Sequence, residues 1–250
     1  MIARRSFLTL AATLAASLGA TLALGGCASE CSTVCEYGQV SRFTYRYRLS
    51  IEIETPEGLA SGSGVLEVRA LDAKGIDGRL PLSGKAGEAV VVDLGRRGSI
   101  FALLKRDYRQ DQRSGELSAD VTLRAANKDQ RKYERYVPLA RDIAATEGVI
   151  EVLPQELPML VRFRDIADPA TVEKVDPNNL AKSFGAGVRL KRATLEITSD
   201  PVTTGIEKRL GWLPQYYDKR LDGQRYGTID TTNRVANSLS SGVFKAGRDL

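Results

Sequence analysis

"RFTYRYRLSIEIE", Arg42 to Glu54, alternates apolar and polar side chains without a break. The side chains of a strand point alternately to opposite faces, so this period of two predicts one long strand with a buried and a solvated face. The expected buried positions are Phe43, Tyr45, Tyr47, Leu49, Ile51 and Ile53. The stretch predicts a fold built on a half-buried, largely antiparallel sheet.

The residues that follow predict a hairpin and further strands. "TPEG", at 55–58, supplies a turn, and Gly64 to Ala70 is the expected return strand. Alternation at 117–125 and 159–163 and the apolar run "AVVVDL" at 89–94 predict more strands. The charged stretch at 105–114 predicts a loop or a hairpin end. A second charged stretch, at 127–136, predicts a helix or a strand, which Pro138 should end in either case.

The C-terminal third differs in character, because three Asp-Pro pairs occur there, at 168–169, 176–177 and 200–201. Asp is a good helix N-cap and Pro fits the first helical position. "DPNNLAKSFG" and "DPVTTGIEKRLG" therefore predict two short helices, each ending at a glycine. Between them, "GVRLKRATLEIT" predicts a strand with a bulge at Lys191-Arg192.

These patterns together predict an α+β fold, a largely antiparallel β-sheet with a few short helices concentrated in the C-terminal third. We expect residues 41–250 to form the globular part. It is either one domain or two subdomains, a β-rich one at 41–147 and an α+β one at 148–250. The globular part, its C-terminal third above all, is similar to alphaproteobacterial proteins that carry no assigned activity, so this resemblance brings no functional residues.

Residues 1–26 have the three parts of a secretory signal. Arg4 and Arg5 form a basic start, an apolar run covers 7–24, and small residues follow. A retained transmembrane anchor is the alternative, but a run rich in Ala, Thr and Gly has only a modest insertion energy. We therefore expect residues 1–26 to be removed.

The apolar run ends in "LGGC", Leu24-Gly25-Gly26-Cys27, and here the chain resembles bacterial lipoproteins. The motif matches the lipobox, in which lipoprotein signal peptidase cuts in front of a diacylglyceryl cysteine. The resemblance implies that Cys27 carries the lipid and that the membrane is a partner. Removal of 26 of the 250 residues would leave a mature chain of 224.

The start of the signal resembles the twin-arginine export motif, and the matching residues are Arg4, Arg5, Phe7 and Leu8. Ala3 and Thr9 depart from the fuller motif. We favour this route over general secretion, because weakly hydrophobic runs suit it. By the lipoprotein resemblance, Ala28 in place of an Asp after the lipidated cysteine implies the periplasmic face of the outer membrane.

Cys31 and Cys35 are the remaining cysteines, and they lie in the expected tether at 27–40. In an oxidising compartment such a pair is expected to form a disulfide. The entropic model gives about 2 kcal/mol for closing so short a ring. A metal site is not expected, because two free thiolates cannot complete a four-ligand site and the chain has no histidine.

Composition narrows the function classes further. Without histidine, Ser-His-Asp and Cys-His catalysis are excluded, and an enzyme would depend on carboxylates, lysine or tyrosine with shifted pKa values. Loss of the two signal arginines would leave 34 basic and 31 acidic residues, a net charge of +3. These charges are interleaved along the chain, so we expect no nucleic-acid partner. No catalytic motif and no cofactor are predicted.

One stretch could form a ligand-binding face. "WLPQYYDKRLDGQRY", at 212–226, holds the only Trp and three of the nine Tyr. Aromatic rings beside basic residues could stack on sugars and hold an anionic group. The alternative is that these rings cover the sheet as part of the core. The candidate ligand-face residues are Trp212, Tyr216, Tyr217, Lys219 and Arg220.

These observations predict a lipid-anchored cell-envelope lipoprotein with a binding or assembly-scaffold role. Its expected partner is an envelope glycan, lipid or protein. The alternative is a carboxylate-dependent hydrolase of an envelope polymer, with Asp218 and Asp222 as the candidate carboxylates. Two facing carboxylates in a cleft would favour the enzyme, and an aromatic surface would favour binding.

Overall fold

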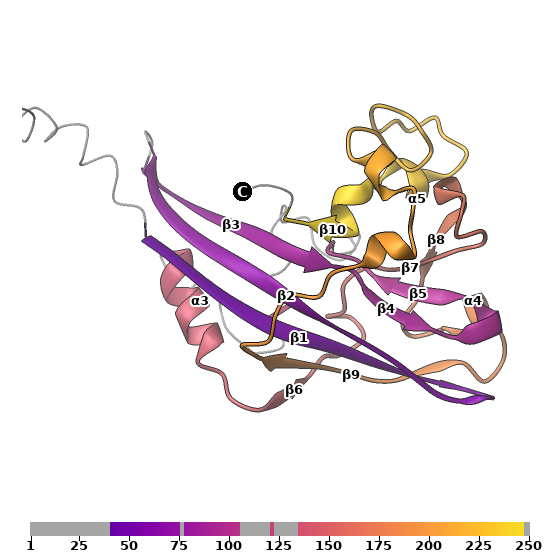
Figure 1. Ribbon diagram of the computed structural model, residues 1–250, viewed down its shortest axis with the longest axis horizontal. Coiled ribbons are helices and arrows are strands. Elements are labelled where there is room, and N and C mark those ends of the chain that lie inside the picture. Colours follow the sequence, from indigo (N-terminus) through magenta and orange to yellow (C-terminus); the bar gives the residue numbers. More distant parts are fainter. Residues whose placement is uncertain (1–40, 76–77, 106–120, 123–134, 248–250) are drawn as a thin grey trace, which may run out of the picture. The chain divides into compact units, whose positions relative to one another are not determined.

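The computed structural model describes residues 41–75, 78–105, 121–122 and 135–247 (Figure 1). The described part contains two antiparallel sheets and three short α-helices, which confirms the predicted α+β class. Gly38–Leu250 forms one compact unit. The predicted division near residue 147 stays a prediction.

The larger sheet has six strands, in the order β10-β3-β2-β1-β9-β6. Their bounds are β1 Ser41–Thr55, β2 Gly58–Gly75, β3 Gly78–Glu88, β6 Val149–Glu151, β9 Arg189–Ile197 and β10 Lys245–Ala246. The quoted stretch is the body of β1, which lies between β2 and β9. From Tyr45 to Ile53 every second side chain is buried, as the alternation predicted. The turn at Pro56 and Glu57 and the return strand β2 are confirmed.

The smaller sheet has four strands, in the order β4-β5-β7-β8. Their bounds are β4 Val90–Asp93, β5 Ser99–Ala102, β7 Leu160–Phe163 and β8 Val172–Val175. Both faces of this sheet are covered, because Ile100 and Ala102 pack in one core cluster and Phe101 in the other. Burial on both faces explains why β4 is a continuous apolar run instead of an alternating one.

The two sheets approach each other closely at a glycine-rich part of β2. A Cβ placed on Gly62 would lie 2.0 Å from the carbonyl oxygen of Val91, and one on Gly64 would lie 3.1 Å from Val90 Cγ2. Backbone of β4 therefore lies directly against backbone of β2, which only residues without a side chain allow.

The first core cluster lies between the larger sheet, the smaller sheet and helix α3, Tyr136–Ala144. Helix α3 packs against β1 and β2, and β4 of the smaller sheet packs against the same two strands (Figure 1). The carboxylate of Asp72 on β2 caps α3, because it accepts hydrogen bonds from the amides of Tyr136 (2.7 Å) and Val137 (3.1 Å). Most of the segment that Pro138 was expected to end, 127–136, lies outside the described residues, so that expectation stays a prediction. Pro138 lies in the first turn of α3, where a helix needs no amide donor.

The second core cluster lies on the other face of the smaller sheet, under the C-terminal segment 206–244. This segment is built from short pieces: η5 Ile206–Lys208, η6 Leu213–Tyr216, α5 Arg234–Asn237 and η7 Ser241–Val243. The buried Glu88 holds its start, because its Oε2 accepts from the amide of Ile206 at 2.7 Å. Lys245, at its end, forms ion pairs with Glu88 (3.2 Å) and with Glu207.

The helix predicted from "DPVTTGIEKRLG" is mostly wrong. Only the 3₁₀ turn η5 forms, and Asp200 forms an ion pair with Arg48 instead of capping a helix. The reason is a pair of hydrogen bonds between Thr203 and the distant strand β2. The amide of Thr203 donates to the carbonyl of Val65 (3.0 Å), and the amide of Val65 donates to Thr203 Oγ1 (2.8 Å). These contacts hold residues before η5 in a non-helical path.

The other predictions for the C-terminal third are confirmed except for the start of one helix, because Leu180 is the N-cap and Asp176 instead accepts from the amide of Asn178 in a turn. Helix α4 covers Ala181–Phe184 and ends at Gly185, whose φ is +95°. The register of β9 against β1 slips at Lys191, the predicted bulge. Asp168 caps the 3₁₀ turn η4, Pro169–Thr171.

The strand predicted at 117–125 and the two charged stretches, 105–114 and 127–136, fall on parts of the chain that the structure describes only partly. Of the strand predicted at 117–125, only Val121 and Thr122 are described, and they are helical. The charged stretches lie almost wholly outside the described residues.

Candidate functional site

The predicted aromatic stretch at 212–226 begins with Trp212, which is 8% exposed and lies in the second core cluster. Its ring makes edge contacts with Phe163, Tyr216 and Phe244, with centroids 5.5–5.7 Å apart. Its Nε1–H donates to the carbonyl of Ile166 at 2.9 Å. Trp212 is therefore part of the core, and its polar edge is fixed at the surface of that core.

A shallow open hollow of about 440 Å³ lies beside Trp212. Its lining residues are Ile166, Ala167, Pro169, Arg209, Gly211, Trp212, Gln215 and Tyr216. Tyr216 is half-buried, while Gln215 and Ile166 are exposed. The hollow combines apolar surface, an aromatic ring and an amide, the mixture that ligand sites commonly present.

Two basic residues are associated with the hollow, Arg209, which lines it, and Lys219, which contacts the lining residue Tyr216. Lys219 Nζ lies 4.5 Å from the centroid of the Tyr216 ring, a cation–π contact. Arg209 donates to the carboxylate of Asp93 at 2.9 Å. This hydrogen bond, followed by one from the amide of Gly95, holds the pKa of Asp93 below its usual range. The charge of Arg209 is thus partly satisfied, while no ion pair of Lys219 is found within the described part of the chain.

The remaining predicted ligand-face residues lie away from the hollow's lining. Tyr217 and Arg220 are half-buried. Arg220 lies near Lys105, and burial, together with the charge of Arg220, lowers the pKa of Lys105. Lys105 donates to the carbonyl of Ser238 at 3.1 Å. The structure therefore brings Trp212, Tyr216 and Lys219 together and places Arg220 in a second basic region.

The candidate carboxylates of a hydrolase have different environments. Asp218 is exposed. Asp222 accepts hydrogen bonds from the amide of Gln224 (3.0 Å), the hydroxyl of Thr231 (3.1 Å) and the side-chain amide of Asn237 (2.6 Å). Both oxygens of Asp222 are therefore engaged in holding its own loop.

A second hollow, of about 430 Å³, lies between β6, β9 and the segment before α4. Three basic residues of the bulged strand line it, but all three form ion pairs with β1: Arg189 with Glu54, and Arg192 (2.6 Å) and Lys191 (3.7 Å) with Glu52. The hydrogen bond from Arg192 is the largest cause of the lowered pKa of Glu52. The positive charges that line this second hollow are already compensated by Glu52 and Glu54. The second hollow is therefore a weaker candidate for anion binding than the hollow beside Trp212.

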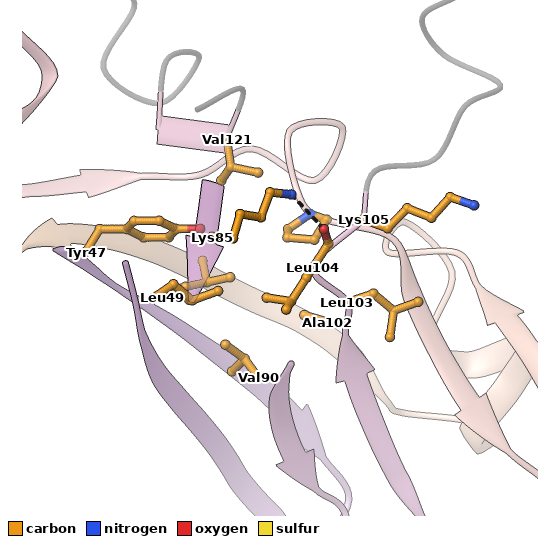
Figure 2. Close-up of a pocket in the computed structure, with 11 residues that line it drawn as sticks. Tyr47, Leu49, Lys85, Val90, Ala102, Leu103, Leu104, Lys105 and Val121 are labelled. Atoms are coloured by element: carbon orange, nitrogen blue, oxygen red, sulfur yellow. Dashed lines mark hydrogen bonds between the residues drawn. The ribbon is translucent and has the colours of Figure 1, made fainter. Parts of the chain in front are cut away.

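A third cavity, in the first core cluster, holds only about 10 Å³ (Figure 2). This is at the lower limit for one water molecule. Figure 2 shows the Tyr47 ring directed at the side chain of Lys85, whose Nζ donates to the carbonyl of Leu104 at 2.9 Å. Burial raises the pKa of Tyr47, and it raises that of Tyr45 to about 12 against the opposing effect of the hydrogen bond between Tyr45 and Thr122. Both tyrosines are therefore neutral structural groups.

The signal and tether residues, Arg4, Arg5, Phe7, Leu8, Cys27, Cys31 and Cys35, lie outside the described residues. Within the described ranges, no group of three or more His, Cys, Asp or Glu side chains is arranged to hold a metal ion. In the same ranges, no helix is both long and apolar enough to cross a membrane.

Of the eight residues that line the hollow, sequence reasoning named only Trp212 and Tyr216, and Ile166 and Gln215 are among the six that it missed. Ile166 carried a signal, because it is an isolated large apolar residue in the polar segment "RDIADP". Gln215 carried none, since its place beside the hollow depends on the turn η6.

Comparisons of the chain with protein-family models, with curated proteins and with solved structures found no match.

Proposed function

We propose that this chain is a lipid-anchored cell-envelope lipoprotein that binds an envelope component without transforming it. It is held through Cys27 at the periplasmic face of the outer membrane. The lipobox "LGGC" behind a basic and apolar signal supports the anchor. The hollow beside Trp212 supports the binding role.

The single observation that carries the binding role is the hollow with Tyr216 and Lys219 on its border. A flat ring offers a stacking surface for a sugar, the exposed amide of Gln215 offers hydrogen bonds to hydroxyl groups, and an ammonium attracts an acidic substituent. An anionic glycan of the envelope satisfies all three. Lipid headgroups and protein partners are the other envelope ligands that such a surface admits.

No observation among the described residues favours the hydrolase alternative. Asp222 is committed to its own loop, as described above, and Asp218 is exposed.

The anchor is tested with Cys27→Ser, which should abolish lipid labelling and leave the precursor uncut. Replacement of Arg4 and Arg5 together by Lys tests the export route, because it keeps the charge but should block twin-arginine transport. Mature-sized, membrane-bound protein from Cys27→Ser would refute the anchor. Undiminished export of the double-lysine variant would refute the route.

The binding role is tested by titrating the protein with peptidoglycan fragments while the emission of Trp212 is recorded. Ligand in the hollow should change this emission, and salt should weaken the effect because Lys219 contributes. Gln215→Ala and Tyr216→Ala should each reduce affinity, whereas Tyr226→Ala, outside the hollow, should not. Equal affinity of all three variants would show that the hollow is not the site.

A further inference from the structure

The loop at 222–232, between η6 and α5, presents apolar side chains to solvent. All residues from Gly223 to Asp230 are exposed. Ile229 is 82% exposed and Tyr226 is 69% exposed, the two highest values among the large hydrophobic residues of the described part. Single exposed apolar residues are common on protein surfaces, so the exposure of Tyr226 and Ile229 alone does not indicate a binding role.

The first support is the way the loop is held. Asn237, which is 3% exposed, lies beneath it. Its Oδ1 accepts from the amide of Thr228 and its Nδ2 donates to Asp222, both at 2.6 Å. The amide of Arg220 donates to the carbonyl of Gln224 at 2.7 Å. A buried amide and a network of short hydrogen bonds thus fix the loop in a shape that keeps Ile229 outside the core.

The second support is charge. Many basic residues elsewhere in the described part form ion pairs: Arg46, Arg48, Arg69, Arg96, Arg97, Arg162, Arg164, Arg189, Lys191, Arg192, Arg209 and Lys245. The four in and around the loop, Lys219, Arg220, Arg225 and Arg234, form no ion pair with a carboxylate within the described part. Two of them lie over tyrosine rings instead, Lys219 over Tyr216 and Arg225 over Tyr226. With Asp218, Asp222 and Asp230 counted, the loop and its flanks carry four basic and three acidic residues, a net charge of +1. The cation of Arg225 lies over the ring of the exposed Tyr226.

We infer that the 222–232 loop docks on the surface of an anionic lipid bilayer. Ile229 inserts among the acyl chains, Tyr226 lies at the level of the headgroups, and Arg225 and its basic neighbours contact lipid phosphates. Tyrosine is enriched at this interface because its ring is amphipathic, and arginine can extend from apolar surroundings to a headgroup. The hollows described above are lined by other residues than those of this loop.

This inference rests on the proposed lipid anchor, which would make the docking intramolecular. The expected tether, 27–40, holds 14 residues between the lipid and the first strand. Fully extended, it spans at most about 50 Å, so the domain stays close to the bilayer and a weak contact suffices.

The test places an environment-sensitive fluorescent amino acid at position 229 of the full protein. The protein is reconstituted in vesicles of phosphatidylcholine, with or without one quarter phosphatidylglycerol. The same label at Leu59, an exposed apolar residue at the start of β2, is the matched control. The label at 229 should shift to the blue and be quenched by nitroxide-labelled lipids in anionic vesicles, and the label at 59 should do neither.

Two variants sharpen the result, with the label then placed at position 226. Ile229→Asp should weaken the bilayer contact about tenfold or more, because an apolar insertion is lost. Arg225→Gln should weaken it about fivefold in anionic vesicles, an effect that high salt should erase. If the lipid anchor is missing, the protein will not float with the vesicles. The labelled loop is then tested by adding preformed vesicles of the same composition to the protein in solution. The label reports the loop directly, so failure of the anchor and failure of the docking remain distinguishable.

An unshifted label at 229 in anionic vesicles would overturn the proposal. A shift that arises only in native membranes and is absent from protein-free vesicles would also overturn it and would assign the loop to a protein partner. Equal shifts with and without phosphatidylglycerol would contradict the role of the basic residues.

Discussion

Gly62 shows how much one residue can decide in this molecule. The strands β2 and β4 meet there backbone to backbone, with no room for a methyl group. The contact sets the distance between the two sheets, and with it the volume of the first core cluster. Trp212 has a similar role in the second cluster, where it contacts three other rings and supports the hollow.

Gly62→Ala should therefore be costly. The new Cβ would lie 2.0 Å from a backbone oxygen that no side-chain rotation can move. We expect a loss of about 1–3 kcal/mol in the free energy of unfolding, the usual range for overpacking, measured by urea titration. Gly211→Ala is the control, because a Cβ there meets nothing within 4 Å. It should change stability by less than about 1 kcal/mol. Equal effects of both variants would contradict the close approach of the sheets.

Trp212→Ala should cost about 3–5 kcal/mol, because it empties the centre of an aromatic cluster. Trp212→Phe should cost less, since it keeps a ring but leaves the carbonyl of Ile166 without its donor. In the unmodified protein the emission of the single Trp should be blue-shifted and poorly quenched by iodide. Emission typical of a tryptophan in water would disprove this placement.

Among the elements, helix α3 depends on a residue from another element for its start. It covers nine residues and has no side-chain cap from its own N-cap, Arg135. Asp72 on β2 supplies the acceptors that the first amides need, across 64 positions of sequence. Helix and sheet are thus joined by two hydrogen bonds as well as by apolar packing.

Asp72→Ala should destabilise the protein by about 1–2 kcal/mol, the usual loss for a helix cap. Two buried amides would have no acceptor in that variant. Asp72→Asn keeps one acceptor oxygen and should lose less. Asp176→Ala removes an acceptor from an exposed turn instead, where the amide of Asn178 can turn to water, and should lose least. The midpoint of urea unfolding ranks the three, and a ranking with Asp176→Ala as the most damaging would refute the cap.

At the scale of the whole molecule, ion pairs cover the solvated face of the long strands. Glu67 is the most buried of these carboxylates. Burial alone would raise its pKa, but hydrogen bonds from Arg69 and Arg46 outweigh burial and hold the pKa below its usual value. Glu57 accepts hydrogen bonds from Arg97 and Arg96, which lower its pKa to about 2. At the other end of the fold, the hydrogen bond between Lys245 and Glu207 lowers the pKa of Glu207 and raises that of Lys245.

These shifts predict how stability depends on pH. Unfolded Glu and Asp titrate near pH 4, so the paired carboxylates contribute fully above about pH 5, and their contribution is lost as pH falls through their lowered folded pKa values. The raised pKa values of Tyr45 and Lys245 act in the opposite direction, and their contribution is lost as pH rises above about 10. The chain has no histidine, so stability should be nearly constant between about pH 5.5 and 8.5. Urea midpoints at pH 3, 4, 5.5, 7, 8.5 and 10.5 check this profile, and a steep change within the neutral range would contradict it.

The sequence by itself determined the elements whose signals are local. The alternation from Tyr45 to Ile53 predicted β1 and its buried face, because strand periodicity is a property of a few successive residues. The turn at Pro56, the glycine that ends α4 and the bulge at Lys191 followed from local backbone preferences in the same way.

Only the tertiary structure decided the features that join distant segments. Thr203 exchanges hydrogen bonds with Val65, and this exchange overrides the helix that the local pattern predicted before Ile206. Helix α3 takes its cap from Asp72, and the hollow beside Trp212 takes part of its lining from Ile166. A single sequence carries no pattern for such contacts, because their strength depends on which strands and turns are brought together in space, and not on the residues beside them in the chain.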